Sequence, residues 1–419
     1  MKNFILGLFF LLLCACGRDS FPVAQADCYQ LPAGTHLPGL TVTPDDLFLS
    51  YVSSEGPLGD DTLMLTKANS LTAGVSVPLA RGDNWFVNWA DLPAVAYLGE
   101  TVQHGPELFY HFLRYSAAGT YDYDVMYGVT DGMAPFSETR KLHRDTVKAE
   151  HGFLSSAPLP GGGLQVTWLD GRYTKQDMGA AAGAKKVKDH GNTHGHGSGG
   201  AMTLRTKALS DSTSVELDHR VCDCCNTATV ATDSLIMVAY RDRSEHEIRD
   251  IGYVIRPNST GEWSSPKLVH ADNWEISGCP VNGPALAANG AGNIAIVWYT
   301  APALRAQINF ARYNPALDRF SAPIVLDDQT PLGRVDLQLA EDGTAYATGL
   351  TTKEDTDDAF LTLWTIAPDG AVAREDLATT SAARSSGFPK IALHENTLYW
   401  ARTVVGAEKG AQFVEVCHR

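Results

Sequence analysis

The chain has 419 residues, of which 44% are hydrophobic, and this is enough apolar material for one large or two average globular domains. Its formal net charge is −15, and no run of Lys and Arg is interleaved with aromatic residues. The composition therefore argues against nucleic acid and anionic membrane surfaces as partners of the molecule as a whole.

The N-terminus has the pattern of an export signal. Residues 4–13 form an apolar run that is too short to span a bilayer. The run leads into Leu-Cys-Ala-Cys16, which resembles a bacterial lipobox. We expect residues 1–15 to be a signal peptide and Cys16 to be lipidated, a plain secretory signal being the alternative. Gly17, in place of an Asp, favours the outer membrane of a Gram-negative bacterium, with membrane contact only through the lipid anchor.

The rest of the chain repeats one unit: an extended apolar stretch, a polar or Gly turn, and a β-branched and aromatic run. Further strand-like stretches follow each unit, and helical periodicity is scarce. This pattern predicts an all-β fold, a single β-propeller of four-stranded blades, with seven blades preferred and six as the alternative. The seven units lie at residues 37–52, 92–113, 155–170, 225–242, 283–300, 335–351 and 388–403.

The last unit has only three strands before the chain stops. The segment 26–31 can supply the fourth strand, so that residues 16–36 form a lipid-anchored segment with a closing strand and residues 37–419 form the propeller. Closure would place Cys28 beside Cys417, and we expect a disulfide there because the export route is oxidising. A His- and Gly-rich stretch at 175–201 interrupts the third unit and is expected to be a flexible surface insertion.

The loops of a propeller alternate between two faces, and here the two sets differ in composition. Loops that join strand four to the next blade, or strand two to strand three, carry Trp, Cys and paired Arg and Asp residues. The other loops are simple turns. Because loops that only connect have no need of such residues, the pattern predicts a functional site on one face.

The blades, and turns such as residues 256–264, resemble the Asp-box (BNR) repeats of the sialidase superfamily, and the resemblance covers most of the mature chain. The loops 220–225 and 240–244 are similar to those of uncharacterised bacterial sialidase-like proteins. The resemblance implies a propeller and, if the protein is an enzyme, an exo-glycosidase of sialidase type. It further implies an arginine triad, a Tyr nucleophile paired with Glu and an Asp acid/base, but the degenerate repeats assign none of these roles to a numbered residue.

Three arginines, Arg172, Arg241 and Arg334, occupy equivalent loop positions. Together they would clamp a carboxylate or phosphate, whereas the alternative is that each pairs with a neighbouring Asp. Trp side chains in the same loops would stack on sugar rings or simply pack beneath the loops. The candidate ligand-binding residues are Arg172, Arg241, Arg243, Arg334, Trp85, Trp89, His151, Asp242 and Asn282.

Glu150, Asp91 and Asp170 are the candidate catalytic residues, because glycoside hydrolysis usually requires two facing carboxyl groups. The alternative role for these carboxylates is hydrogen bonding within loops. We expect the ligand to be a glycan or a small anion, and the protein to be a monomer. A non-catalytic binding propeller is the alternative function.

The most specific feature is the sequence Cys222-Asp-Cys224-Cys225, together with Cys279. Disulfides between neighbouring blades are the preferred interpretation. A thiolate site for Zn or Cu and a redox pair are the alternatives. No cofactor is required by the rest of the sequence.

Overall fold

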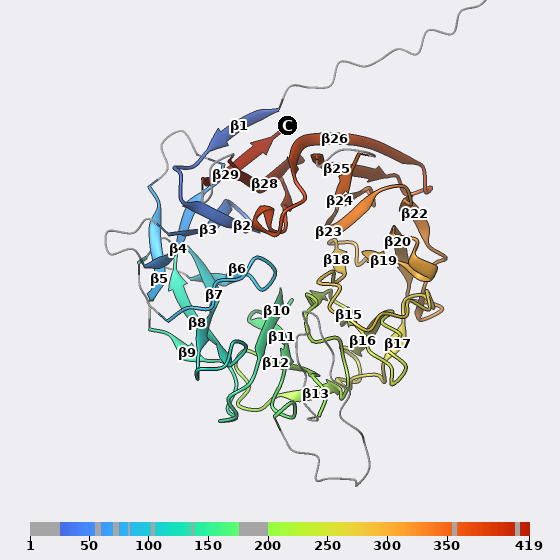
Figure 1. Ribbon diagram of the computed structural model, residues 1–419, viewed down its shortest axis with the longest axis horizontal. Helices are drawn as coiled ribbons and strands as arrows, with labels where there is room; N and C mark the ends of the chain where they lie inside the picture. Colours follow the sequence, from blue (N-terminus) through green and yellow to red (C-terminus); the bar gives the residue numbers. More distant parts are fainter. Residues whose placement is uncertain are drawn as a thin grey trace, which may run out of the picture.

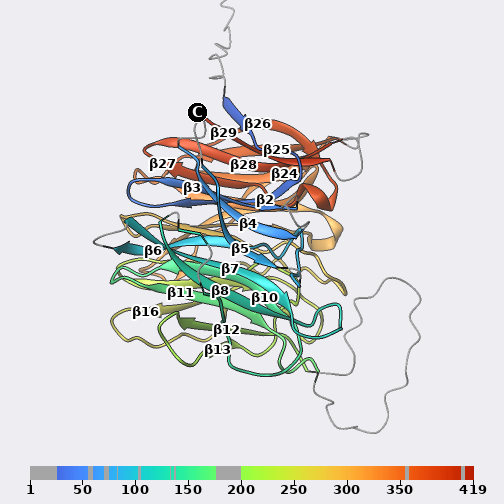
Figure 2. The same ribbon diagram turned by 90° about the vertical axis from the view of Figure 1, so that its left-hand side faces the viewer.

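The protein is a ring of seven antiparallel sheets around a central axis (Figure 1). The computed structural model describes residues 26–419 except 55–59, 70–74, 83, 102–104, 133, 136–137, 176–199, 354–357 and 407–410. Cys16, residues 1–15 and most of the 175–201 insertion therefore lie outside the described residues. Seen edge-on, the ring is a thick disc with loops on both sides (Figure 2). The seven-bladed propeller predicted from the repeats is confirmed.

Each blade is a four-stranded meander, and blade five carries one additional short strand. Blade one contains β2 (Thr35–Val42), β3 (Leu47–Ser53), β4 (Asp61–Lys67) and β5 (Val77–Gly82). Blade two contains β6 (Ala94–Thr101), β7 (Gly105–Tyr115), β8 (Tyr123–Asp131) and β9 (Arg140–Lys141). Blade three contains β10 (His151–Pro158), β11 (Leu164–Asp170), β12 (Thr203–Ala208) and β13 (Val215–Asp218). Blade four contains β14 (Ala228–Ala231), β15 (Leu235–Arg241), β16 (Ile251–Pro257) and β17 (Lys267–Leu268).

The other three blades follow the same order. Blade five contains β18 (Ala285–Ala288), β19 (Ile294–Thr300), β20 (Gln307–Asn314), β21 (Arg319–Phe320) and β22 (Ile324–Asp327). Blade six contains β23 (Pro331–Leu339), β24 (Ala345–Thr352), β25 (Asp358–Ile366) and β26 (Val372–Ser381). Blade seven contains β27 (Lys390–His394), β28 (Thr397–Val405), β29 (Gln412–His418) and β1 (Asp27–Gln30). In the described chain, helical structure is limited to two 3-10 turns, η1 (Pro302–Leu304) and η2 (Arg384–Ser386), and no helix is long and apolar enough to cross a membrane.

The core consists of the apolar faces of neighbouring blades packed against each other. Four fully buried tryptophans lie on middle strands: Trp168, Trp298, Trp364 and Trp400. Each belongs to a cluster formed by two adjacent blades, such as the cluster of Trp298 with Ile251 and Tyr253. Burying an aromatic side chain of this size stabilises the fold by about 2–3 kcal/mol. The β-branched and aromatic runs of the sequence are thus the residues that fill the spaces between blades.

The N-terminal strand closes the ring, as the sequence predicted. β1 pairs antiparallel with β29, and the register places Cys28 opposite Cys417. Their sulfur atoms are 2.08 Å apart, in a disulfide that joins residues 389 positions apart in the chain. In Figure 1, β1 and β29 lie side by side close to the C-terminus. The expected Cys28–Cys417 disulfide is confirmed.

Candidate functional site

A cavity of about 420 Å³ opens among the connections from blade one to two, two to three, three to four, four to five and six to seven. A second cavity of about 280 Å³ lies between the inner strands and shares Ala90, Asp91 and Phe153 with the first. The larger cavity therefore lies at a mouth of the central channel. Its loops belong to the two classes in which the sequence concentrates Trp, Cys and charged residues. The lining residues are Phe86, Asn88, Trp89, Ala90, Asp91, Tyr121, Tyr123, Glu150, Phe153, Asp223, Cys224, Cys279, Val281 and Arg384.

Two predicted catalytic carboxyl groups, those of Asp91 and Glu150, contact the same phenol. The Tyr123 hydroxyl lies 3.2 Å from Asp91 Oδ2 and 2.8 Å from Glu150 Oε1. The backbone brings Tyr123 and Glu150 together, because Glu150 forms a parallel β-bridge with Tyr123 at the start of β8. Stacking of Phe86 on Tyr123, with ring centroids 4.3 Å apart, fixes the phenol from the side.

The hydrogen bonds of this triad require a shared proton. A phenol has one proton to donate, so it can donate to only one of the two carboxyl groups. The other contact needs a protonated carboxyl group that donates to the phenol oxygen. Burial raises the pKa of Asp91 to about 7 and that of Glu150 to about 8, and the charges of Asp91 and Asp223 contribute to the Glu150 shift. At neutral pH the triad therefore holds a carboxylic acid, the state required of a general acid.

A backbone irregularity in β10 holds Asp91 in place. Phe153 has a left-handed backbone (φ 51°) at a β-bulge, and its N–H donates to Asp91 Oδ1 at 2.8 Å. The bulge also turns the Phe153 side chain toward the cavity. Gly152 packs so closely on Asp91 that a Cβ atom there would collide with Asp91 Oδ2 and the Tyr123 ring.

Gly152→Ala is therefore expected to displace Asp91 and Tyr123 while leaving the blades folded. We expect a loss of about 1–3 kcal/mol in the free energy of unfolding, because the new methyl group has no space. Denaturant unfolding measures this loss, and the rise of tyrosine absorbance with pH reports the altered triad. Gly161→Ala is the control, because a Cβ at Gly161 meets no atom. Equal stability of the two variants would contradict the tight packing.

A cluster of His, Asp and Arg side chains comes from residues on both sides of Glu150 in the chain. The imidazoles of His143 and His151 stack with centroids 3.7 Å apart. Asp145 lies 2.6 Å from His143 Nδ1 and 3.3 Å from His151 Nε2. Although burial alone would raise the pKa of Asp145, hydrogen bonds from both imidazoles hold it well below its usual range. His151, a predicted ligand-binding residue, is fully buried and is absent from the cavity lining. Its Nδ1 lies 3.3 Å from the carbonyl oxygen of Tyr123 and 3.1 Å from that of Ala149.

Asp170 and Arg172 belong to the same cluster. Arg172 donates from Nε and Nη2 to the two carboxylate oxygens of Asp170, both at 2.7 Å, and Trp168 Nε1 donates to the same carboxylate. Burial favours the neutral form of Asp170, but these hydrogen bonds outweigh it and lower its pKa. Neither Asp170 nor Arg172 lines the cavity. This geometry matches the alternative in which the arginine pairs with a neighbouring Asp.

Arg241 and Arg334 are buried, and their guanidinium groups donate hydrogen bonds mainly to backbone carbonyl oxygens. Arg241 donates to the carbonyl oxygens of Asn282, Arg249 and Tyr299 at 2.6–2.9 Å. Arg334 donates to the carbonyl oxygens of residues 382, 383 and 387 and to the Ser386 hydroxyl, which fixes η2. The three arginines thus do not converge on the cavity. Asn282 is also structural, since its side-chain Oδ1 accepts a hydrogen bond from the backbone N–H of Arg334 at 2.8 Å.

Arg243 pairs with Asp223, a cavity residue, at 3.0 Å, and with Glu247 at 2.8 Å. It therefore supports the cavity wall from outside. The side chain of Asp242 remains outside the cavity lining, and burial raises its pKa to about 6.

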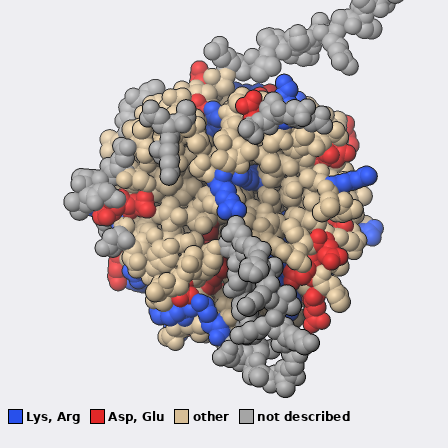
Figure 3. All heavy atoms as spheres, viewed as in Figure 1, with Lys and Arg blue, Asp and Glu red and all other residues tan. Residues whose placement is uncertain are grey.

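The two predicted tryptophans have different positions. Trp85 is buried and stacks on Phe112 with centroids 4.4 Å apart, so its role is packing. Trp89 lines the cavity, where Arg384 lies over its ring at 5.8 Å from the centroid. Figure 3 shows Lys and Arg side chains near the middle of the viewed face and also at its rim, where they alternate with acidic side chains.

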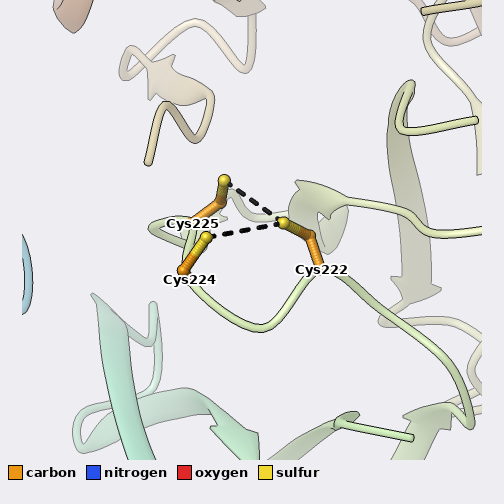
Figure 4. A group of neighbouring side chains, drawn as sticks. All are labelled: Cys222, Cys224 and Cys225. Atoms are coloured by element: carbon orange, nitrogen blue, oxygen red, sulfur yellow. Dashed lines mark hydrogen bonds between the residues drawn. The ribbon is translucent and has the colours of Figure 1, made fainter. Parts of the chain in front are cut away.

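Three cysteine sulfurs converge at the cavity wall (Figure 4). Cys224 forms a disulfide with Cys279, and both residues line the cavity. Cys222 and Cys225 are buried free thiols, with Cys222 Sγ 3.5 Å from Cys225 Sγ and 3.9 Å from Cys224 Sγ. The preferred disulfide interpretation is thus confirmed for one pair and not for the other. The His219 side chain next to this loop is 89% exposed.

Sequence reasoning missed Tyr123, Tyr121, Phe153 and Arg384 as cavity residues. Tyr123 and Phe153 lie on strands, where an aromatic residue usually indicates core packing. Arg384 lies in a Ser- and Ala-rich turn with no unusual composition. The one signal in the sequence that could have identified them was the loop class, because residues near the strand ends on this face lie around the same mouth of the central channel.

No family model and no curated protein matches the chain. Among solved structures, polysaccharide lyase Uly1 is 12% identical with a TM-score of 0.50, covering 91% of this chain and 89% of that one. An ulvan lyase of polysaccharide lyase family PL25 is 10% identical with a TM-score of 0.53, covering 92% and 95%. The same kind of enzyme bound to -[GlcA(1-4)Rha3S]- is 11% identical with a TM-score of 0.53 and the same coverage. At these identities the similarity shows only that the chain shares a β-propeller fold with these carbohydrate-active enzymes.

Proposed function

We propose that this protein is a cell-envelope glycoside hydrolase whose glycan substrate binds in the 420 Å³ cavity. The observation that carries the proposal is the Tyr123 hydroxyl held between the carboxyl groups of Asp91 and Glu150. Retaining a proton on a carboxyl group at neutral pH is the property that a glycosidase acid requires. A Tyr beside a Glu is also part of what the sialidase resemblance implies, although there the Tyr is the nucleophile and an Asp is the acid/base. Carbohydrate-active enzymes share the fold.

Glu150 is assigned the role of general acid. It lines the cavity, so its proton can reach a glycosidic oxygen of a bound substrate. Tyr123 is the hydrogen-bonded partner that exchanges this proton, and the buried carboxyl group of Asp91 positions Tyr123. Aromatic side chains at the wall offer flat apolar surfaces to sugar rings. Arg384 supplies a cation for an anionic sugar such as a uronic or sialic acid.

Trp89→Ala is expected to weaken glycan binding at least tenfold, because it removes the aromatic surface of the cavity. Arg384→Ala should weaken binding of acidic glycans only. An array of neutral and acidic oligosaccharides, followed by calorimetric titration of the best ligand, measures both effects.

The matched controls are Tyr29→Ala and Arg319→Ala, two exposed residues on outer strands away from the cavity. Melting temperatures of all four variants separate lost binding from lost folding, since Trp89 also contacts Arg334 and Phe388. Unchanged glycan affinity in a folded Trp89→Ala protein would contradict the proposal. Binding without any turnover would favour the alternative of a non-catalytic binding propeller.

A further inference from the structure

The four sulfurs at the cavity wall are arranged in two layers. The outer layer is the Cys224–Cys279 disulfide, which lines the cavity and joins the loop before β14 to the loop before β18. The inner layer is the pair of free thiols of Cys222 and Cys225, each 1% exposed. Cys222 Sγ lies 3.5 Å from the sulfur of the other free thiol, Cys225, and 3.9 Å from the disulfide sulfur of Cys224. These separations are close to sulfur–sulfur contact, and a small side-chain rotation brings them to the distance for reaction.

The surroundings of Cys222 stabilise a thiolate. Arg249 Nη1 donates to Cys222 Sγ at 3.1 Å, and the Arg249 side chain is buried. Glu247 holds this guanidinium in place with contacts from its Oε2 to Nε and Nη2 at 3.2 and 2.7 Å. Burial opposes ionisation, yet the Cys225 hydrogen bond and the Arg249 charge lower the pKa of Cys222 to about 6. Burial raises the pKa of Cys225 well above its usual value, so the two thiols are unequal.

We propose that Cys222, Cys224, Cys225 and Cys279 form a thiol–disulfide exchange centre that passes two electrons between the buried dithiol and small-molecule disulfides in the cavity. This activity is separate from glycan processing and needs no glycan. Its substrates are low-molecular-weight disulfides, because Cys224 and Cys279 line a cavity of only about 420 Å³.

The internal exchange is balanced without an added oxidant. The Cys222 thiolate attacks Cys224 Sγ, a Cys222–Cys224 bond forms, and the Cys224–Cys279 bond breaks to release the Cys279 thiolate. Cys225, after losing its proton, attacks Cys222 Sγ and releases the Cys224 thiolate. The buried pair is then a disulfide, and the two cavity cysteines are reduced.

The cavity cysteines then react with the external substrate. The Cys279 thiolate attacks a disulfide RSSR, which releases one thiolate RS⁻ and leaves a mixed disulfide. Cys224 resolves the mixed disulfide, releases the second RS⁻ and restores the Cys224–Cys279 bond. The net reaction oxidises the buried dithiol and reduces RSSR to two thiols. The Cys28–Cys417 disulfide at the ring seam takes no part and serves as an internal reference.

Cys225→Ser tests the first step, because it removes the residue that completes the exchange. In this variant Cys279 should be labelled by N-ethylmaleimide, and peptide mapping should find a Cys222–Cys224 disulfide. The control is Cys222→Ser, which lacks the attacking thiolate and should label Cys279 at least about tenfold more slowly. Adding Arg249→Met to Cys225→Ser should slow labelling at pH 7 by roughly tenfold or more, because less Cys222 is ionised.

The wild-type protein provides a second measurement if a variant fails to fold. With Cys222 and Cys225 as free thiols and the Cys224–Cys279 disulfide intact, one equivalent of oxidised glutathione should yield about two equivalents of reduced glutathione and a Cys222–Cys225 disulfide. Cys279 labelling that is absent from Cys225→Ser, or equal in both single variants, overturns the proposal. One equivalent of bound zinc or copper, with all four cysteines reduced, also overturns it in favour of a metal site.

Discussion

Replacing Glu150 with Gln is expected to slow hydrolysis of glycosides with poor leaving groups by roughly 10²–10⁴-fold, the usual contribution of a positioned general acid. The amide keeps the shape of the side chain and can still contact the Tyr123 hydroxyl, but it has no proton to give to the glycosidic oxygen. Aryl glycosides, whose leaving group needs no protonation, should lose much less activity. Steady-state rates on a matched pair of alkyl and aryl glycosides of the preferred sugar measure the difference.

The pH dependence gives the same test a second measurement. Because burial raises the pKa of Glu150 to about 8, hydrolysis of alkyl glycosides by the wild type should fall as pH rises through about 8. The folded-state pKa lies above the unfolded value, so the neutral carboxyl group contributes stability below about pH 4.5 that is lost as pH rises through about 8. The Glu150 contribution, on the order of 5 kcal/mol, should be lost from the wild type over this range. Glu150→Gln should lack this contribution and keep only the loss that comes from the raised pKa of Asp91.

Glu262→Gln is the control for both measurements, because Glu262 is exposed in a turn between strands three and four of blade four, at the opposite end of the blade. A Glu150→Gln protein that hydrolyses alkyl and aryl glycosides equally well would remove Glu150 from the role of acid. Unchanged pH dependence of unfolding would show that the carboxyl group ionises normally in the folded protein.

Removing the ring-closing disulfide is expected to cost about 5 kcal/mol of unfolding free energy in the chain-entropy view, because the bond closes nearly the whole chain into a loop. Cys28→Ser/Cys417→Ser should keep the propeller, since the pairing of β1 with β29 remains. Its melting temperature and its midpoint in urea should both fall. Urea unfolding of the double variant and the wild type under non-reducing conditions measures the change.

Tyr29→Ala is the control, because Tyr29 lies on the same strand with an exposed side chain and should change stability by only about 0.5 kcal/mol. A double variant that is as stable as this control would mean that strand pairing alone closes the ring. Peptide mapping that finds Cys28 paired with any other cysteine would contradict the closure itself.

The sequence determined the architecture because the propeller is built from local, repeated patterns. Each unit contains its own hairpin, so the alternation of apolar residues and the Gly and Asp turns predicts the strands of each blade without information from the others. The count of units gave seven blades, and the three-stranded last unit required the strand at Asp27–Gln30 to complete it. Closure also predicted the Cys28–Cys417 pair, because it brings the N-terminal strand beside the last strand of blade seven, and the observed register places the two cysteines opposite each other. The loop classes also indicated the face on which the cavity opens.

Only the tertiary structure decided which side chains share the cavity. Tyr123 lies 32 residues from Asp91 and 27 from Glu150, and no local period connects them. The directions of Arg241 and Arg334 could not be predicted. Both lie on strands, β15 and β23, and the turns around them decide whether the guanidinium points to the cavity or to backbone carbonyl groups. The pairing of Cys224 with Cys279, which leaves Cys222 and Cys225 as thiols, depends on distances between two blades. Local sequence patterns determine the strands and turns. Contacts between blades depend instead on the directions of side chains at bulges and loop ends, and hydrophobic periodicity does not predict these directions.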